Sequence, residues 1–527
     1  MSHDLMSHDL MSHDVVSHSM SYDLVVIGGG PAGVAGALTA ALGGLRVALL
    51  DASARLGGQY FRHQAGDDSG PQGFDRFLRQ CRALGDRAEV LLKHQVWSVT
   101  RDQDAHLDQD GNLDRDGHLD RDARLDRDGH LDRDGRLIVH AVTADRRPVT
   151  LRARHVLIAT GAYDRPLPFT GWDLPGVLTA GGAQALLKGN GVVAGRRIVV
   201  SGTGPFLLPV AAGLAGAGAE VIGVFEANGG LGLARHPVLA LGKAGEALGY
   251  GLRLAGARVP YLTRQAVVAA HGRDELESVT VARLDRNWNV LATRRVACDT
   301  LAVGYGFVPQ IDLGTQLGCR TRADVDGSPV LAVDALQRTD VPGVWAAGEP
   351  TGVGGWRLAA LEGRIAGLAI ARSHAVTATS RAVTATSRAV TATSRAVTGG
   401  RTPERPGDAG VPEALVRRRE RMRAFGAALQ RAYPVAPGWR TWLRDDTLVC
   451  RCEEVPLAAI RQAQDLGATD ARSVKSLARP GMGWCQGRMC GYAVSCLVGE
   501  PQRPPRRPIA QPVTLGALAE TVEDPAP

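Results

Sequence analysis

The stretch Leu24-Val-Val-Ile-Gly-Gly-Gly-Pro-Ala-Gly33 decides the fold of this chain. Its four apolar residues predict a buried parallel strand, and its glycines have the G-x-G-x-x-G spacing of a turn that binds a dinucleotide. An Ala-rich helix is predicted over 31–42, and a second apolar strand over 45–50 ends at Asp51. Strand, glycine turn, helix, strand and acid in this order make a complete dinucleotide-binding unit.

Each position of this unit has a predicted role. Gly28 permits the tight turn, Gly30 admits the pyrophosphate, and Gly33 lets the helix pack closely on the strand. The N-terminus of the helix faces the phosphates, and the acid accepts hydrogen bonds from ribose hydroxyls. The residues predicted to bind the dinucleotide here are Gly28, Gly30, Pro31, Ala32, Gly33 and Asp51.

A second unit of this kind begins with the strand over 197–201 and continues with Gly202-Thr-Gly204. Its acid is Glu226, which would repel a 2′-phosphate and so favour NAD over NADP. Leu207 replaces the third glycine and is expected to push the helix away from the strand. The fold of the unit is therefore predicted. Binding of NAD(H), binding of another nucleotide and a purely structural role all stay open for it.

Five of the eight cysteines lie from residue 450 onward. Four thiolates that converge on one centre suit zinc or an iron–sulfur cluster. We favour a [2Fe–2S] centre, because a redox-silent zinc would add little beside a redox-active dinucleotide, whereas a cluster extends an electron path. The predicted metal ligands follow the pattern C-x-C, a gap of 32 residues and C-x4-C, and are Cys450, Cys452, Cys485 and Cys490.

The other cysteines are predicted to be small core residues: Cys81, Cys298, Cys319 and Cys496. No cysteine pair of a disulfide reductase is found in either dinucleotide unit, which argues against thiol–disulfide exchange. Three cations flank the predicted metal ligands, namely Lys475, Arg479 and Arg488. They either offset the negative charge of a cluster and raise its reduction potential, or are solvated surface charges.

The composition, with 44% hydrophobic and 22% charged residues, is that of a soluble globular protein, and 527 residues predict about three domains. The net charge of +7 comes from scattered arginines and not from one basic stripe, which argues against a nucleic-acid partner. We find no signal peptide and no apolar run long enough for a membrane span. These features predict a cytoplasmic protein, with peripheral contact at the inner face of the membrane left open.

The strand over 155–158 ends in Ala159-Thr-Gly161, and this resembles flavoproteins with two dinucleotide-binding domains, of the glutathione-reductase type. The resemblance implies that the first unit binds FAD. It also implies that the side chain after Gly348 meets the ribityl chain of FAD, and that Gln59 lies near the isoalloxazine ring. The further residues implied to contact FAD are Gly58, Gln59, Thr160, Gly161, Gly348 and Glu349, while Tyr163 and Arg165 are hypothesised to line the passage between the domains.

Four stretches together resemble the FAD-containing A (alpha) subunit of two-subunit bacterial opine oxidases. Relatives of that family are the B subunit of hydrogen cyanide synthase and the alpha subunits of dye-linked proline and hydroxyproline dehydrogenases. The cysteine stretch is similar to bacterioferritin-associated ferredoxin, which implies a [2Fe–2S] cluster. Trp356-Arg357 departs from the pattern, where smaller or acidic residues are expected. The stretches are 159–166, 174–177 with 181–184, 347–352, and 450–454 with 487–490.

The predicted fold class is α/β, with two glutathione-reductase-like Rossmann domains and a small α-rich [2Fe–2S] domain. The predicted order is a disordered repeat tail (1–21), an FAD-binding domain (22–162 and 296–370) with a repeat insertion (101–137), a second NAD(P)-type domain (163–295), a repeat linker (371–411), a helical connector (412–447), the [2Fe–2S] domain (448–500) and a disordered tail (501–527).

The resemblance implies an electron-transferring subunit of a heteromeric amino-acid, opine or (hydroxy)proline dehydrogenase. Its partner would be a smaller FAD-containing oxidase (beta) subunit that oxidises the substrate, and its acceptor a quinone or ferredoxin. One alternative is a self-contained NADH-dependent reductase that delivers electrons to ferredoxin, quinone or a dye. Another is a non-catalytic role in iron traffic or redox sensing. No residue in the sequence identifies the substrate, and no catalytic residue is assigned.

Overall fold

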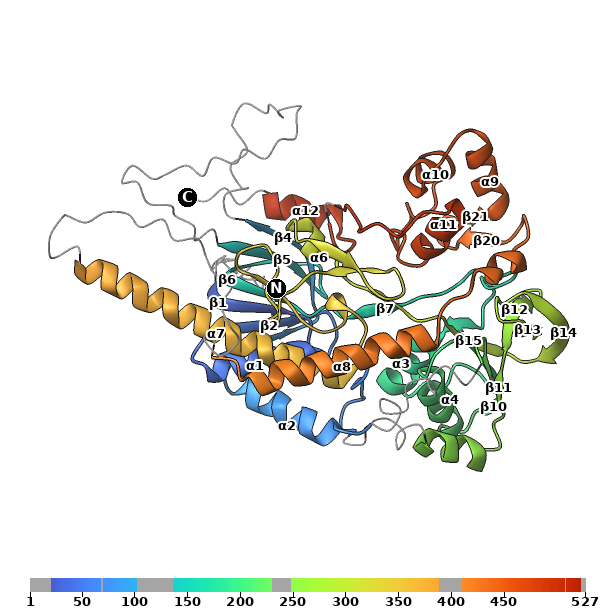
Figure 1. Cartoon of the computed structure of the whole chain (residues 1–527), viewed down its shortest axis with the longest axis horizontal. Helices are drawn as coiled ribbons and strands as arrows, with labels where there is room; N and C mark the ends of the chain where they lie inside the picture. The colour runs from blue at the N-terminus through green and yellow to red at the C-terminus, as the bar shows by residue number, and fades with distance from the viewer. Residues whose placement is uncertain are drawn as a thin grey trace, which may run out of the picture.

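The computed structural model describes residues 20–67, 70–101, 136–229, 248–387, 410–507 and 509–522. In this part the chain forms two α/β dinucleotide-binding domains and a smaller helical segment that carries the four predicted metal ligands (Figure 1). The predicted α/β fold class is thus confirmed. Most of the predicted repeats, at residues 1–19, 102–135 and 388–409, lie outside the described residues.

The first domain is built on a seven-stranded sheet with β1 in its middle. β1 pairs in parallel with β2 and β6, and β6 also pairs in parallel with β19. The predicted strands on both sides of the 102–135 insertion, β4 and β5, pair with each other in antiparallel order. The strands are β1 (Met20–Ile27), β2 (Val47–Asp51), β3 (Glu89–Leu92), β4 (His94–Arg101), β5 (Leu137–Thr143), β6 (Pro148–Ile158) and β19 (Val344–Ala346).

Helices α1 (Pro31–Leu42), α2 (Phe74–Gly85) and α7 (Trp356–Ser387) pack along one face of this sheet (Figure 1). The backbones of the turn, α1 and α7 nearly touch. A Cβ on Gly33 would stand 1.8 Å from the carbonyl oxygen of Gly28, and one on Gly363 would stand 1.9 Å from that of Ala32. Only glycine fits at such distances, so the glycine pattern sets how closely these elements approach. The helix predicted over 358–370 extends further than expected, into the first part of the predicted linker.

The second domain has a five-stranded parallel sheet in the order β11-β10-β9-β15-β8. The assignment of residues 300–304 to the first domain is wrong, because β15 lies between β9 and β8. A separate antiparallel sheet follows in the order β12-β13-β14. The elements are β8 (Val177–Thr179), α3 (Ala180–Asn190), β9 (Arg197–Gly202), α4 (Leu207–Gly216), β10 (Glu220–Glu226), β11 (Tyr261–Thr263), β12 (Gln265–His271), β13 (Ser278–Leu284), β14 (Val290–Ala297) and β15 (Thr300–Gly304).

An antiparallel ribbon joins the two domains, made of β7 (Ala162–Asp164) and β16 (Phe307–Pro309). The chain re-enters the first domain through this ribbon, about ten residues later than the predicted boundary at 296. The short elements that complete the first domain are α6 (Asp312–Gln316), β17 (Thr321–Ala323), β18 (Pro329–Leu331) and the 3-10 helix η3 (Glu349–Thr351).

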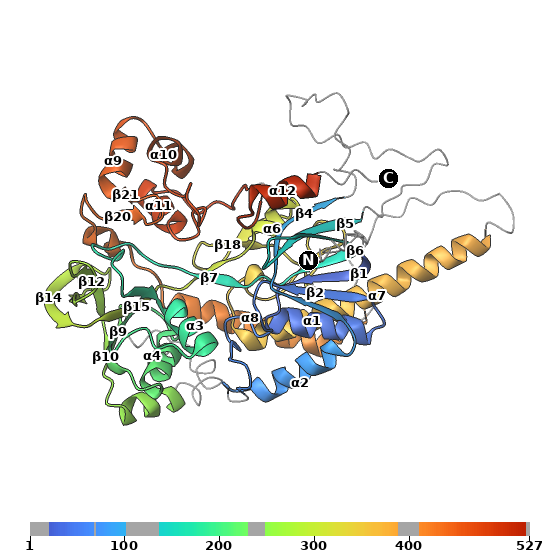
Figure 2. The same ribbon diagram turned by 180° about the vertical axis from the view of Figure 1, so that it is seen from behind.

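The predicted connector contains one long helix, α8 (Glu413–Ala432), which lies beside α7 (Figures 1 and 2). Beyond it, the cysteine segment shares a hydrophobic core with the second domain, and this core includes Trp288, Trp442 and Cys450. Trp442 stacks on Trp288 at 5.9 Å between ring centroids. The remaining elements are η4 (Pro437–Trp442), β20 (Leu448–Cys450), β21 (Val455–Pro456), α9 (Leu457–Asp465), α10 (Ala471–Ala478), α11 (Gly491–Val498) and α12 (Leu515–Val522).

The C-terminal tail does not match the predicted disorder over 501–527, because residues 509–522 return to the first domain and end in α12. Both views show α12 beside β4 (Figures 1 and 2). The backbone amide of Ala510, a buried residue, donates to the carbonyl of Trp97 at 2.7 Å, and the side chain of Gln95 donates to the carbonyl of Pro512 at 3.2 Å. These contacts with β4 hold a Pro-rich segment whose composition alone favours disorder.

We predict that Gly33→Ala destabilises the first domain by about 3 kcal/mol, the upper range for overpacking, because its Cβ would overlap the Gly28 carbonyl. The matched control is Gly216→Ala in α4, where a Cβ meets no atom within 4 Å and helix propensity improves by up to about 1 kcal/mol. Thermal unfolding with flavin absorbance measures both effects. Equal melting temperatures for the two variants would contradict the packing argument.

Candidate functional site

The glycine turn between β1 and α1 brings several predicted FAD contacts together. Asp51 accepts hydrogen bonds from the backbone amides of Gly29, at 2.6 Å, and Ser53, at 2.7 Å. Its carboxylate therefore ties the end of β2 to the turn. A Cβ on Gly30 would meet only the Cα of Gly58, at 3.9 Å, so the turn leaves open space at the N-terminus of α1. Such a cradle fits a pyrophosphate.

The strand ends around this turn place the other predicted contacts nearby. The Thr160 hydroxyl donates to the carbonyl of Gln310 at 2.7 Å, and the amide of Gln310 donates to the carbonyl of Gly161 at 3.0 Å. A Cβ on Gly348 would stand 3.1 Å from that of Ala32, so the later turn adjoins the start of α1. The chain thus gathers both predicted turns at one end of the sheet. FAD contact by each of these residues remains a prediction.

Glu349 accepts a hydrogen bond from the amide of Gly355 at 3.0 Å, and burial raises the pKa of its carboxyl. Its side chain is therefore bound within its own loop. Gln59 accepts from the Arg62 guanidinium at 3.2 Å. Trp356, the departure from the family pattern, stacks on Tyr60 with 5.5 Å between ring centroids. Trp356 thus packs on the loop after Gln59 and helps to hold this loop in place.

Lys188 was missed by the sequence analysis. It lies on α3 of the second domain, and its ammonium donates to the carbonyl of Tyr60 at 3.1 Å. Burial lowers the pKa of this lysine to about 8, with a further contribution from the charge of Arg62. The second domain therefore places a lysine with a lowered pKa against the loop that follows Gln59. An isolated lysine on an amphipathic helix carries no signal by which sequence could have found it.

The acid of the second unit lies in a different environment from Asp51. Glu226 is fully buried and accepts from the Thr203 hydroxyl at 2.7 Å, and from the amides of Gly204 at 2.8 Å and Asn228 at 2.9 Å. Asp51 is only partly buried. All the bonds of the Glu226 carboxylate go to protein donors, so it has no exposed surface for ribose hydroxyls. Burial raises the pKa of its carboxyl.

The segment after α8 covers this second acid. The side-chain amide of Asn228 donates to the carbonyl of Pro434 at 2.9 Å, and its carbonyl oxygen accepts from the Trp288 indole at 3.3 Å. Leu207, in place of the third glycine, is buried in the apolar cluster between α4 and the sheet. This arrangement favours a structural role for the second unit over binding of NAD(H).

The four predicted metal ligands form a row of contacting thiols. The sulfurs of Cys450 and Cys452 are 3.9 Å apart, and those of Cys452 and Cys485 are 3.6 Å apart. A hydrogen bond from Cys490 lowers the pKa of the Cys450 thiol to about 5, while the same bond and burial raise the pKa of Cys490. In the described residues no three His, Cys, Asp or Glu side chains surround one common ion position. The expected convergence of all four on a single point is therefore not seen.

The row runs from the interior to the surface. Cys450 and Cys490 are buried in the core shared with the second domain, and Cys452 is exposed. Trp484, beside Cys485, is 81% exposed. Cys298 and Cys319 are buried as predicted, whereas Cys81 and Cys496 are half-buried.

A buried ion pair that the sequence analysis missed ties α8 to the turn after Gly348. Glu362 of α7 is fully buried and accepts from Arg419 at 3.0 Å and Arg423 at 2.5 Å. Arg423 also donates to the carbonyl of Gly352 at 2.5 Å. Glu362 itself accepts from the amide of Gly348 at 3.0 Å. Helix α8 of the predicted connector therefore holds the turn that was predicted to contact FAD.

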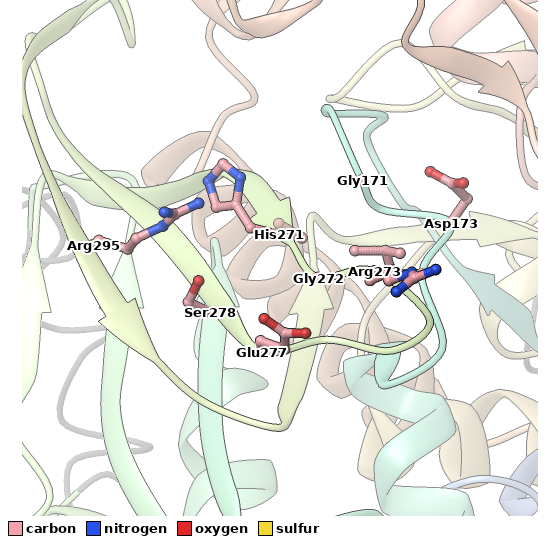
Figure 3. A pocket seen from close by; sticks show the side chains of 10 residues that line it. Gly171, Asp173, His271, Gly272, Arg273, Glu277, Ser278 and Arg295 are labelled. Atoms are coloured by element: carbon pink, nitrogen blue, oxygen red, sulfur yellow. The ribbon is translucent and has the colours of Figure 1, made fainter.

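A separate polar hollow of about 550 Å³ lies at the edge of the second domain, lined by loop 171–174 and by β12 to β14 (Figure 3). Its charged side chains come from both sides, with Arg295 on one side, Arg273 and Asp173 on the other, and Glu277 between them (Figure 3). It contains none of the residues predicted to bind FAD or metal.

Residues 22–375 match the pyridine nucleotide-disulphide oxidoreductase family. The chain belongs to this family. HcnB, a subunit of hydrogen cyanide synthase from Pseudomonas protegens, is 30% identical to it over 496 residues, which cover 90% of this chain and 91% of that protein. The A subunit of opine oxidase from Rhizobium meliloti is 29% identical over 538 residues, covering 95% and 99%. The predicted resemblance to the A subunits of opine oxidases is confirmed, and the protein is a flavin-dependent oxidoreductase.

The solved structure of an L-proline dehydrogenase from P. horikoshii has the same fold, with a TM-score of 0.61 and 19% identity over 95% of this chain and 79% of that one. Among the residues that the structure describes, no helix of this flavoprotein has the length and apolar character needed to cross a bilayer.

We predict that Arg423→Met lowers the free energy of unfolding by about 3 kcal/mol, because it leaves the buried Glu362 carboxylate with one cation in place of two. Flavin occupancy should fall with it, since the turn at Gly352 loses a donor. Denaturant unfolding and the flavin-to-protein absorbance ratio measure these effects. Arg417→Met on the same helix breaks an exposed pair with Glu413 and should cost at most about 0.5 kcal/mol. Similar losses in both variants would argue against this role.

Proposed function

We propose that this flavoprotein is the electron-transferring subunit of a heteromeric amino-acid, opine or (hydroxy)proline dehydrogenase. The observation that carries the proposal is the burial of Glu226, the acid of the second nucleotide unit. With Glu226 fully buried and bonded to protein donors, the second unit offers no free carboxylate to the ribose of NADH, which favours another source of electrons. Two relatives are named as subunits, of hydrogen cyanide synthase and opine oxidase, which points to a partner chain as that source.

FAD is the redox group of the first domain in this proposal, and it supplies two-electron uptake when bound. The chain's own residues orient it. The α1 N-terminus and the open space at Gly30 hold the pyrophosphate, Asp51 fixes the turn, and α8 supports the second turn through Arg423. The partner is a smaller FAD-containing oxidase subunit that oxidises the substrate, so this chain need not contact the amino acid.

A [2Fe–2S] centre held by Cys450, Cys452, Cys485 and Cys490 is the second redox group proposed here. The chemistry of the donor set supports it, because four soft thiols lie in a contacting row. A two-iron centre shares four thiolates between two irons, which suits a row of two adjacent pairs. The exposed Cys452, in contact with Cys485, provides an outlet to an acceptor such as a quinone or ferredoxin.

We predict that NADH alone leaves the visible spectrum of the purified chain unchanged under anaerobic conditions. Adding the partner subunit with an amino or imino acid should bleach the flavin band. Fast bleaching by NADH alone would contradict the proposal and favour the self-contained reductase.

We also predict that Cys450→Ser removes the iron–sulfur absorption bands after reconstitution and leaves the flavin bands in place. Cys496→Ser is the matched control, since this thiol is half-buried on α11 and lies outside the row. Retention of the cluster bands in Cys450→Ser, or their absence from the reconstituted parent chain, would disprove the ligand assignment.

A further inference from the structure

A junction between the predicted flavin site and the cysteine row forms around Tyr163. Strand β7 begins directly after Gly161, and the Tyr163 ring lies under the Arg488 guanidinium, with 5.5 Å between guanidinium carbon and ring centroid. Gln511 of the tail donates to the Tyr163 hydroxyl at 2.7 Å. Three parts of the chain that are far apart in sequence therefore meet at one tyrosine.

Arg488 connects this tyrosine to the metal ligands. Its guanidinium donates to the carbonyl of Cys485 at 3.3 Å and to the carbonyl of Ala510 in the tail. It also pairs with Asp312 at 3.5 Å, and both side chains are 9% exposed. Three partners thus hold the positive charge of Arg488 in place. This residue lies two positions before Cys490 in the sequence.

Asp312 belongs to the first domain and stands close to the predicted flavin contacts. It opens α6, two residues after Gln310, which is hydrogen-bonded to both Thr160 and Gly161. Arg507 of the tail also pairs with Asp312 and donates to the carbonyl of Gln486. Asp312 therefore links the flavin end of the sheet, the cysteine segment and the tail.

The other two cations that flank the cysteines lie in a different environment. Lys475 is exposed on α10, and Arg479 is 69% exposed and paired with Glu453 at 3.6 Å. Water and salt screen such exposed charges, whereas a buried charge acts on its neighbours through a medium of lower dielectric constant. Of the two roles left open for these three cations, the surface role fits Lys475 and Arg479, and Arg488 alone is placed to act on the cysteine row.

We infer that Arg488, fixed by Asp312 and the tail, raises the reduction potential of the centre held by the cysteines and docks that centre on the flavin domain. The inference rests on the proposed function. A [2Fe–2S] centre held by these cysteines would gain one negative charge on taking one electron from reduced FAD, and it would lose that charge on passing the electron to a one-electron acceptor. A fixed positive charge beside Cys485 stabilises the more negative, reduced state. Arg488 is thus a positioning and tuning residue.

The test uses the reconstituted full chain and measures the midpoint potential of the centre by spectroelectrochemistry. Arg488→Gln should shift the equilibrium at least tenfold toward the oxidised centre, which is about 59 mV for one electron. Arg488→Lys should restore most of the potential because it keeps the charge. Lys475→Gln, the matched control with an exposed charge on the same segment, should leave the potential unchanged. An unchanged potential in Arg488→Gln, or an equal shift in Lys475→Gln, would overturn the inference.

Docking is tested with a second variant that keeps Arg488, and its first measurement needs no metal. Asp312→Asn should speed hydrogen exchange of the backbone amides in 509–522 at least tenfold in the metal-free chain, because the buried arginines lose their shared partner. Flavin reduction by the partner should not change, while electron transfer from flavin to the centre should slow. Unchanged exchange and transfer would refute the docking role. Absence of any centre in the parent chain would overturn the proposed function as well, whereas a normal centre that ignores both variants overturns this inference alone.

Discussion

The close approach of backbones at the first glycine turn is the constraint on which the rest of the structure depends. Because Gly33 and Gly363 carry no side chain, β1, α1 and α7 meet within distances that any Cβ would prevent. That contact sets the N-terminus of α1 against the end of the sheet, where Asp51 holds the turn. The later turn at Gly348, the helix α8 that supports it and the link to the second domain are all placed relative to this end.

The two dinucleotide units show how one local motif serves two purposes. Asp51 and Glu226 both end a strand and both accept from a backbone amide of their glycine turn. They differ in what lies above them. Asp51 borders open space at Gly30, while Glu226 is covered by Asn228 and the segment after α8. A carboxylate at the end of the strand therefore does not by itself make a nucleotide site. Whether a nucleotide can reach it depends on the segments that pack over it.

Local patterns predicted most of the elements, and long-range contacts account for the errors. Glycine spacing and apolar runs were enough for β1, α1 and the strand pairs around residues 102–135, because these signals lie within a short stretch. An apolar run such as 300–304 fits either parallel sheet, so its partner could not be identified. The tail is held by individual hydrogen bonds to β4, and its Pro-rich composition gives no sign of them. The sequence predicted which four cysteines lie together. Their arrangement in a row, and not around one point, depends on the fold of the whole segment.

Three buried charged residues form ion pairs at joints between segments, and their location suggests what these pairs do. Glu362 joins α7 to α8, Asp312 joins the first domain to the cysteine segment and tail, and Arg165 joins β7 to Asp326 at 2.5 Å, with its guanidinium over the ring of Tyr492. Burying two charges costs desolvation energy that their attraction offsets only in good geometry, so such pairs add little net stability. They do raise the free energy of every arrangement of the segments in which one charge stays buried without its partner. Charges of this kind therefore fix where the segments dock, which the proposed electron path from the flavin to the cysteine row requires.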